Sequence, residues 1–324
     1  MTTSAITPDL EAYGRYARSS AIADWLELAA LKGRRVTRAQ LEDLFHDYGW
    51  TTKKPQQFIT VEDDFDEEDS NGSSGADYYS DVPELWSESI HSILLERADA
   101  LGDAWPFTLR GNWEIVASRR PQPTPYLLLL ALAVAHSRGL RTSEEPTALV
   151  EGTVARALSN KGWLVTSMGT SDRNGDSFQE NLANVGDALG LPVQDPAFPA
   201  KRYAKDAGVD TLTFVGWPDK RLAGQWLSVG QVTIAKSERW QIKLLEPRPD
   251  HWAAYFLQNV HPVRFLAVPH HVERPHVNYL VGASTGVLVD RLRLCQDLTH
   301  INESERQFLT EVLSFPVDDG RSIA

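Results

Sequence analysis

The chain has 324 residues, 42% of them hydrophobic, which suffices for one large domain or two modest ones with a sizeable core. Its formal net charge of −12 disfavours a general electrostatic attraction to nucleic acid. The single cysteine, Cys295, excludes a disulfide framework and a cysteine-based zinc site, and it fits a reducing cytoplasm.

The acidity is concentrated in the first half of the chain. Residues 1–150 hold 14 Lys and Arg against 24 Asp and Glu, whereas residues 151–324 hold 18 against 20. Much of the excess lies in one acidic run at residues 62–69. The second half is therefore close to neutral, and a basic face on it is compatible with the composition.

Neither a secretory signal nor a membrane span is predicted. Residues 1–15 (MTTSAITPDLEAYGR) lack a cationic start followed by an apolar core. The longest apolar run, residues 126–135 (YLLLLALAVA), is too short to cross a bilayer and predicts a buried helix. We expect a cytoplasmic protein without a membrane partner.

The first part of the chain is predicted to be mainly helical. Apolar periodicity and a Thr37 cap predict a helix over 8–31 and another over 37–48, joined by a glycine-containing turn. This pair is typical of an αα-hairpin; the alternative is a helix-turn-helix, which the acidic residues of the second helix disfavour. Further elements are predicted as helices over 85–102 and from 126 onward, with a short strand at 113–116.

Residues 61–82 are first acidic and then rich in Ser and Gly, which predicts a flexible, solvated loop. A calcium site is the alternative, because acidic residues alternate there. No twelve-residue EF-hand loop fits the spacing, however.

Helices and strands alternate in the second part, which predicts an α/β fold and a division into a helical domain (1–140) and an α/β domain (141–324). Helices are predicted over 147–160, 178–189, 239–245 and 302–313, and strands over 163–168, 211–217, 225–235 and 263–269.

Polar residues that could perform chemistry lie in this second part. Asp210 opens one predicted strand, Gln231 and Lys236 lie in and after the next, and Glu151 lies on the helix before them. Phosphodiester hydrolysis needs a divalent cation held by oxygen ligands beside a positive charge. Two adjacent strands hold such groups rigidly.

In this order of residues the sequence resembles the PD-(D/E)xK nuclease superfamily, over roughly residues 147–270. The resemblance implies a restriction-endonuclease-like αβ sandwich in which Glu151 is the helix acid, Asp210 the strand acid and Gln231 stands at the second acid position. It implies that these three residues ligate Mg²⁺ or Mn²⁺ and that Lys236 positions the nucleophile or stabilises the transition state. More narrowly, it points to a subgroup with Gln at that position, which Trp240 also fits.

Two departures from the family pattern stand out. Gln231 is neutral, and the usual lysine position, two residues later, is Thr233. Strand alternation directs Lys236 to the opposite face from Gln231 unless the strand ends or bulges near Ala235. Lys243, on the following helix, is the alternative source of the amine.

Other motifs were considered in the same region. His270, His271 and His276 are predicted to lie in a loop, where a zinc site is a weaker alternative. Residues 290–293 are interpreted either as an exposed basic turn that touches DNA or as an ion pair. Residues 282–286 are predicted to form a turn, and the chain has no G-x-S-x-G, P-loop or Rossmann glycine motif.

The resulting hypothesis is a metal-dependent endonuclease in restriction or anti-phage defence, with DNA as the expected substrate and RNA as the alternative. The helical domain is expected to serve regulation or contact with partner proteins of a defence system, and a homodimer is expected. Two alternatives stay open. One is an inactive nuclease fold that binds nucleic acid or a partner protein; the other is a helical interaction module whose acidic loop masks a basic site or mimics DNA.

Overall fold

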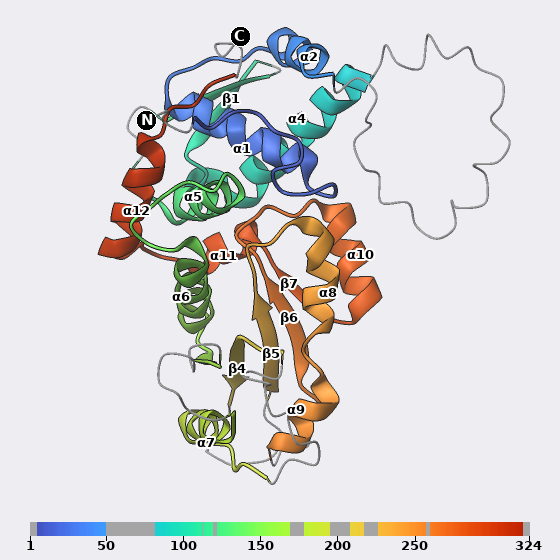
Figure 1. Cartoon of the computed structure of the whole chain (residues 1–324), viewed down its shortest axis with the longest axis vertical. Coiled ribbons are helices and arrows are strands. Elements are labelled where there is room, and N and C mark those ends of the chain that lie inside the picture. Colours follow the sequence, from blue (N-terminus) through green and yellow to red (C-terminus); the bar gives the residue numbers. More distant parts are fainter. Residues whose placement is uncertain are drawn as a thin grey trace, which may run out of the picture.

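The computed structural model describes residues 5–49, 82–111, 113–118, 122–168, 178–194, 208–216, 226–256 and 260–319. The molecule is elongated, with helices gathered at one end and a sheet at the other (Figure 1). The acidic stretch predicted as a loop at 61–82 lies outside the described residues except for Val82.

The helical end is built from both ends of the chain. Its helices are α1 (Arg18–Leu31), α2 (Arg38–Asp47), α4 (Val82–Leu101), α5 (Pro125–Ser137) and α12 (Glu303–Ser314), with the hairpin of β1 (Phe107–Arg110) and β2 (Glu114–Ala117) beside them. Thr37 caps α2 as predicted, and every residue of 126–135 is buried in α5, which confirms the predicted buried helix. The exposed side of α2 carries Asp43 and Asp47, a poor surface for reading DNA.

The other end holds a mixed sheet of five strands in the order β3-β4-β5-β6-β7. The first two pairings are antiparallel: β3 (Leu164–Ser167) with β4 (Thr211–Val215), and β4 with β5 (Trp226–Val232). The next two are parallel: β5 with β6 (Val263–Ala267), and β6 with β7 (Val287–Val289). The helices of this end are α6 (Pro146–Asn160), α7 (Phe178–Leu189), α8 (Trp240–Leu245), α9 (Pro249–Tyr255), α10 (Arg274–Ser284) and α11 (Arg291–Asp297). The predicted α/β class is therefore confirmed.

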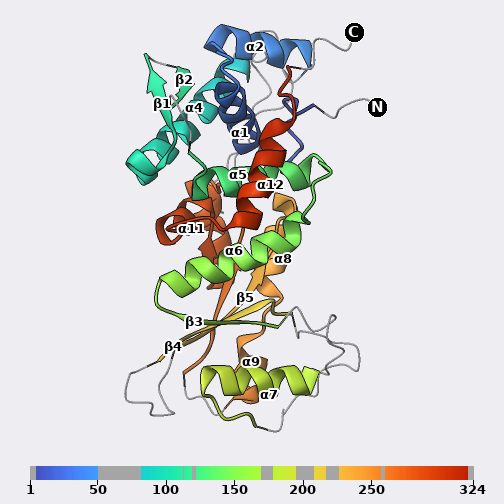
Figure 2. The same ribbon diagram turned by 90° about the vertical axis from the view of Figure 1, so that its left-hand side faces the viewer.

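Helices cover both faces of the sheet. α6 and α8 lie on opposite sides of the strands, and α7 and α9 lie at the far end of the molecule (Figures 1 and 2). Leu212 on β4 pairs with Val229 on β5, and both belong to the hydrophobic cluster formed with α7 and α9. Asp210 lies two residues before Leu212, and Gln231 lies two residues after Val229, so the same alternation directs both to this face.

A larger hydrophobic cluster joins the helical end to the sheet. It extends from Ile6 to Val312 and includes residues of α1, α4, α5, α6 and the ends of β5 and β6 nearest to them. Residues before and after position 140 thus share one core. The division of the chain at that position stays a prediction.

Several elements differ from those expected. The first helix begins at Arg18 and not at residue 8, because the preceding segment turns at Gly14, whose φ angle is +87°. β5 ends at Val232, three residues earlier than predicted. Helices α9, α10 and α11, and the short strand β7, were not predicted.

Within the described ranges, none of the helices combines the length and apolar character that crossing a bilayer requires.

Candidate functional site

Asp210 is bonded to β5 on either side of Gln231. Its backbone N–H donates to the carbonyl of Gly230 at 2.9 Å, and its Oδ2 accepts the N–H of Val232 at 2.9 Å. Its carbonyl accepts the N–H of Met168 at 2.9 Å, which ties it to the β3 side as well. Asp210 is therefore fixed beside Gln231 by hydrogen bonds to two neighbouring segments, β5 and the end of β3.

Gln231 is buried, with 3% of its surface exposed, and its amide oxygen meets a lysine. Nζ of Lys243 donates to Oε1 of Gln231 at 3.3 Å and lies 2.8 Å from Oε2 of Glu246. α8 carries Lys243 and packs on β5 and β6, so the ammonium approaches from the helix that covers this face. The structure thus joins an amine to the amide of Gln231, and it bonds the Asp210 carboxylate to the backbone of the next residue, Val232.

Lys236 stands outside this hydrogen-bonded group in the described part of the chain. β5 ends at Val232, so strand alternation no longer fixes the direction of Lys236. The backbone turns instead, with the N–H of Ala235 donating to Oγ1 of Thr233 at 3.2 Å. The exposed Lys236 then precedes a short 3₁₀ helix, Ser237–Arg239.

Glu151 lies on α6, which covers the opposite side of the strands from α8 (Figure 1). It is half-buried and shares its helix face with the buried Val154 and Leu158, three and seven residues later. The acid therefore projects from the side of α6 that faces the protein, but from a different face of the sheet than Lys243.

The donor atoms at Asp210 and Gln231 suit a hard cation. A carboxylate and an amide oxygen are ligands that Mg²⁺ accepts, and this ion commonly keeps several waters beside one or two carboxylates. Among the described residues, no three His, Cys, Asp or Glu side chains gather as a metal-binding group. An ion here would therefore be held by few protein atoms, and Gln231 would have to share its oxygen with Lys243 or release it.

The three histidines considered for zinc are buried; His270 and His276 pack on aromatic rings, and Nδ1 of His271 accepts a hydrogen bond from Nε of Arg97 at 3.1 Å. His276 lies on α10, not in a loop, and its ring stacks on that of Trp240 with centroids 5.3 Å apart. The ring of His270 meets Tyr13 edge-on at 4.6 Å. Burial lowers the pKa of His276 to about 3, and burial together with the charge of Arg291 lowers the pKa of His270 to about 3. Both rings are therefore neutral near pH 7.

Arg293 of the segment 290–293 is exposed, whereas Arg291 is fully buried in an ion pair, so the interpretation as an exposed basic turn is wrong for Arg291 and that of an ion pair is confirmed for it. The Arg291 guanidinium donates two hydrogen bonds of 2.7 Å to the carboxylate of Asp24. Arg97 binds the same carboxylate at 2.7 Å and Glu27 at 3.0 Å. These contacts serve the interior and are not available to DNA.

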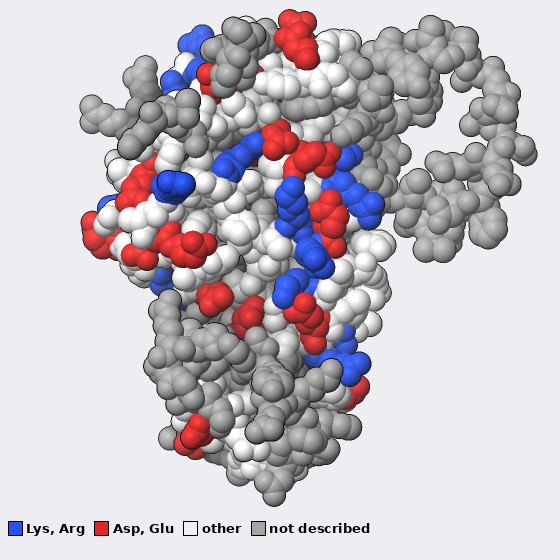
Figure 3. Space-filling view, in the orientation of Figure 1, with Lys and Arg blue, Asp and Glu red and all other residues white. Residues whose placement is uncertain are grey.

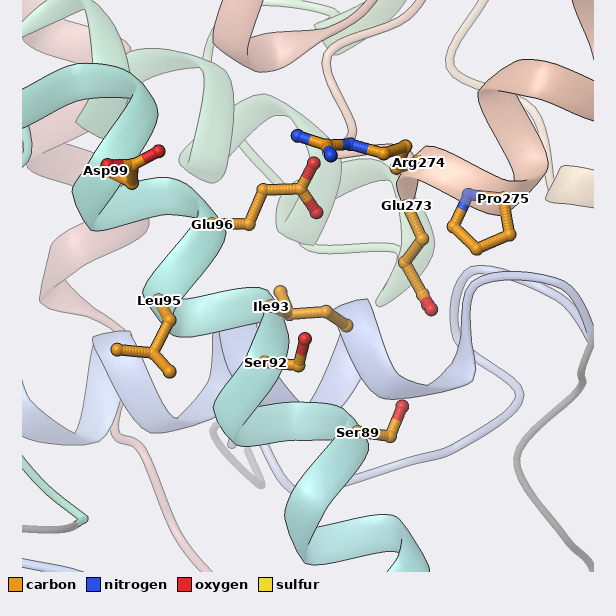
Figure 4. Close-up of a pocket in the computed structure, with 9 residues that line it drawn as sticks. All are labelled: Ser89, Ser92, Ile93, Leu95, Glu96, Asp99, Glu273, Arg274 and Pro275. Carbon is orange, nitrogen blue, oxygen red and sulfur yellow. The ribbon is translucent and has the colours of Figure 1, made fainter.

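The charge pattern and a described cavity do not add to the site. On the face shown in Figure 3, Lys and Arg alternate with Asp and Glu and form no continuous basic surface. A cavity of about 490 Å³ lies between α4 and the start of α10, where Arg274 extends over Glu96 and the carboxylate of Glu273 points another way (Figure 4). None of the candidate residues lines it.

Sequence reasoning missed Glu246, the acid that holds Lys243. The i, i+3 spacing of the two residues at a helix end was the available signal. Compared with protein-family models, with curated proteins and with solved structures, the chain matches none.

Proposed function

We propose that the chain is a metal-dependent nuclease that cleaves nucleic acid, DNA in the first instance. The observation that carries this proposal is the position of Asp210 across Gln231 on adjacent strands, with the ammonium of Lys243 on the amide oxygen. These contacts support a site in which the acid, the amide and the lysine act together at the end of a hairpin of strands. The order of residues that resembles the PD-(D/E)xK superfamily implies such a site.

Each residue has a distinct role in the proposal. The N–H of Val232 fixes the direction of the Asp210 carboxylate, which needs no reorganisation to receive a cation. Gln231 supplies a second, neutral oxygen. A Mg²⁺ ion bound there would polarise the phosphodiester and lower the pKa of the attacking water.

The two lysines divide the remaining work. Lys243 is held by Glu246 and orients the amide of Gln231, so we assign it a positioning role. Lys236 is exposed beyond the end of the same strand, where its amine can meet a phosphate approaching from solvent. We assign to Lys236 the stabilisation of charge in the transition state.

The resemblance implies Glu151 as the helix acid of the site. Because α6 carries it over the other face of the sheet than Lys243 (Figure 1), the proposed cation site is limited to Asp210 and Gln231. The cellular role that accompanies the proposal is restriction or anti-phage defence, which depends on the resemblance alone.

A second candidate is a nuclease fold without activity that binds nucleic acid or a partner protein. The observation that favours it is the contact between Lys243 and Oε1 of Gln231, because an ammonium occupies the atom that a cation would need. The neutral amide also makes the site less anionic than one with two carboxylates.

The deciding experiment incubates wild type, Asp210→Asn and Asp250→Asn with plasmid DNA, single-stranded DNA and RNA. Each reaction is run with Mg²⁺, with Mn²⁺ and with a chelator. Asp250 is the matched control, since its side chain is 84% exposed at the start of α9.

Metal-dependent cleavage that Asp210→Asn loses and Asp250→Asn keeps supports the nuclease. If all three folded proteins bind DNA and none cleaves any substrate, the inactive fold is favoured. Equal cleavage by wild type and Asp210→Asn would place the activity elsewhere.

A further inference from the structure

The segment of residues 13–16 lies across the short 3₁₀ helix that follows Lys236. The N–H of Ser237 donates to the carbonyl of Tyr13 at 2.8 Å, and Oγ of Ser237 accepts the N–H of Tyr16 at 3.1 Å. Oε1 of Glu238 accepts the N–H of Arg15 at 2.7 Å. Residues more than 220 positions apart in sequence are thus joined by three hydrogen bonds.

Gly14 makes this close approach sterically feasible. Its φ angle of +87° lies in the left-handed region that favours glycine. A Cβ built at this position would overlap Oε2 of Glu238 and would lie 2.7 Å from Oγ of Ser237. Any other residue here would push Glu238 away from the N–H of Arg15.

Aromatic rings fix the same loop from the other side. Trp240 donates its indole N–H to the carbonyl of Ala235 at 2.8 Å, directly before Lys236. Its ring lies against His270, which Tyr13 contacts in turn. The hydroxyl of Tyr13 donates to Asp24 at 2.5 Å, so the segment is anchored in the buried ion pairs of the helical end.

Lys236 therefore lies between two anchors, the carbonyl of Ala235 and the N–H of Ser237. β5 has ended four residues before it, so the sheet no longer determines where its backbone lies. The carbonyl that accepts the N–H of Ser237 belongs to Tyr13, at the helical end of the molecule, and not to the sheet.

We propose that residues 13–16 are a positioning element for Lys236, through which the helical end controls the cleavage reaction. The inference rests on the proposed function, since it takes Lys236 to act on the phosphate. A displacement of these residues, by a partner protein or by a mutation, would release Ser237 and Glu238 and withdraw the lysine from the site.

The test compares Gly14→Ala with Gly33→Ala, and it adds Glu238→Gln. Gly33 is a matched control because its φ angle is also positive, at +73°, but nothing lies within 4 Å of a Cβ built there. Both alanine variants carry the same kind of backbone strain, and only Gly14→Ala collides with Glu238. Steady-state kcat and KM for DNA are measured with hydrogen exchange in the peptide that covers residues 233–240.

We expect kcat of Gly14→Ala to fall about 10- to 100-fold with KM little changed, because misplacing a reacting group by about 1 Å has effects of that size. Exchange in residues 233–240 should accelerate in Gly14→Ala and Glu238→Gln, but not in Gly33→Ala. Glu238→Gln keeps the side-chain shape, so it tests the contact if Gly14→Ala fails to fold.

The double variant Gly14→Ala with Glu238→Ala gives a further control. It removes the nearer of the two groups that the new Cβ strikes and leaves only Oγ of Ser237, so Gly14→Ala should lower kcat less in the Glu238→Ala background than in wild type. An active wild type with unchanged kcat in Gly14→Ala and Glu238→Gln would overturn the inference and leave the nuclease standing. A wild type that cleaves nothing would overturn both.

Discussion

The guanidinium of Arg291 holds the carboxylate of Asp24 with two hydrogen bonds of 2.7 Å, although 267 positions separate the two residues. Both side chains are completely buried, and Arg97 meets the same carboxylate from α4. A buried charge is tolerated only where it is paired and hydrogen-bonded. The pair therefore locks α1, near the start of the chain, to α11, which follows the last strand.

Asp24→Asn should lower the free energy of unfolding by about 3–5 kcal/mol, because it leaves two buried guanidiniums short of one negative charge. Glu42→Gln is the control, since Glu42 pairs with Arg38 at the surface, four residues apart on α2. Its cost should be about 0.5 kcal/mol or less. Urea titration of both variants measures the difference, and equal costs would contradict a desolvated pair.

Asp24 also predicts how stability responds to acid. Burial alone would raise its pKa, but the charges of Arg291 and Arg97 hold the pKa well below its ordinary value. The stabilisation is thus present above the pKa of the unfolded chain and is lost as pH falls toward the lower folded pKa. Asp24→Asn should remove this part of the acid-induced loss, which urea titrations between pH 5 and pH 2.5 would detect.

The ionisation of Glu273 should change stability with pH in the direction opposite to that of Asp24. Burial and the neighbouring Glu96 raise its pKa to about 7 from an ordinary 4.5. The folded chain therefore binds the proton more tightly than the unfolded chain. This stabilisation is complete below pH 4.5 and is lost as pH rises through 7.

The variant Glu273→Gln stays neutral at every pH, so its stability relative to wild type should rise by about 1–3 kcal/mol between pH 5 and pH 8. Glu303→Gln is the control, because the Glu303 side chain is 90% exposed. Urea titrations at the two pH values test the prediction, and parallel behaviour of the two variants would refute it.

The sequence predicted most elements whose periodicity is local, such as the apolar helix α5 and the strands β4 and β5. It did not predict that Arg291 is buried, because its partner Asp24 lies at the other end of the chain and no local pattern links them. His276 was expected in a loop after a strand, and that segment contains Pro275. In the structure this proline occupies the first turn of α10, where its missing N–H does no harm.

For the candidate site, the sequence identified Asp210 and Gln231 as neighbours on adjacent strands, and the structure places them so. The end of β5 was set three residues too late, because residues 233–235 continue the apolar pattern although the chain already turns there. The expected direction of the Lys236 side chain therefore depended on where β5 ends. The sequence could not decide whether Lys243 contacts Gln231. Periodicity shows which face of a helix is buried, but not where the helix lies on the sheet.

Replacing Gln231 by Glu should strengthen metal binding. The change adds a second buried carboxylate beside that of Asp210. The two carboxylates repel each other in the metal-free protein, and together they attract a cation more strongly. We expect the metal-free variant to melt at a lower temperature than wild type, and Mg²⁺ to raise its melting temperature more than it raises that of wild type. Gln231→Leu is the control and should lose the response to metal; equal Mg²⁺ responses in wild type and both variants would place the ion away from residue 231.

Replacing each of the two lysines should change different kinetic parameters. Lys236→Met removes an amine that acts only in the transition state, so kcat should fall about 100-fold or more while KM and the Mg²⁺ concentration for half-maximal rate stay nearly constant. Lys243→Met instead frees Oε1 of Gln231 from its hydrogen bond and leaves Glu246 without its partner. Its main effect should therefore be a changed Mg²⁺ requirement, with a smaller loss of kcat. Metal titrations of the rate for both variants separate these outcomes.

If Lys243→Met abolishes kcat and Lys236→Met does not, Lys243 is the lysine that acts on the phosphate. The amine then comes from the helix over the sheet and not from the loop after β5.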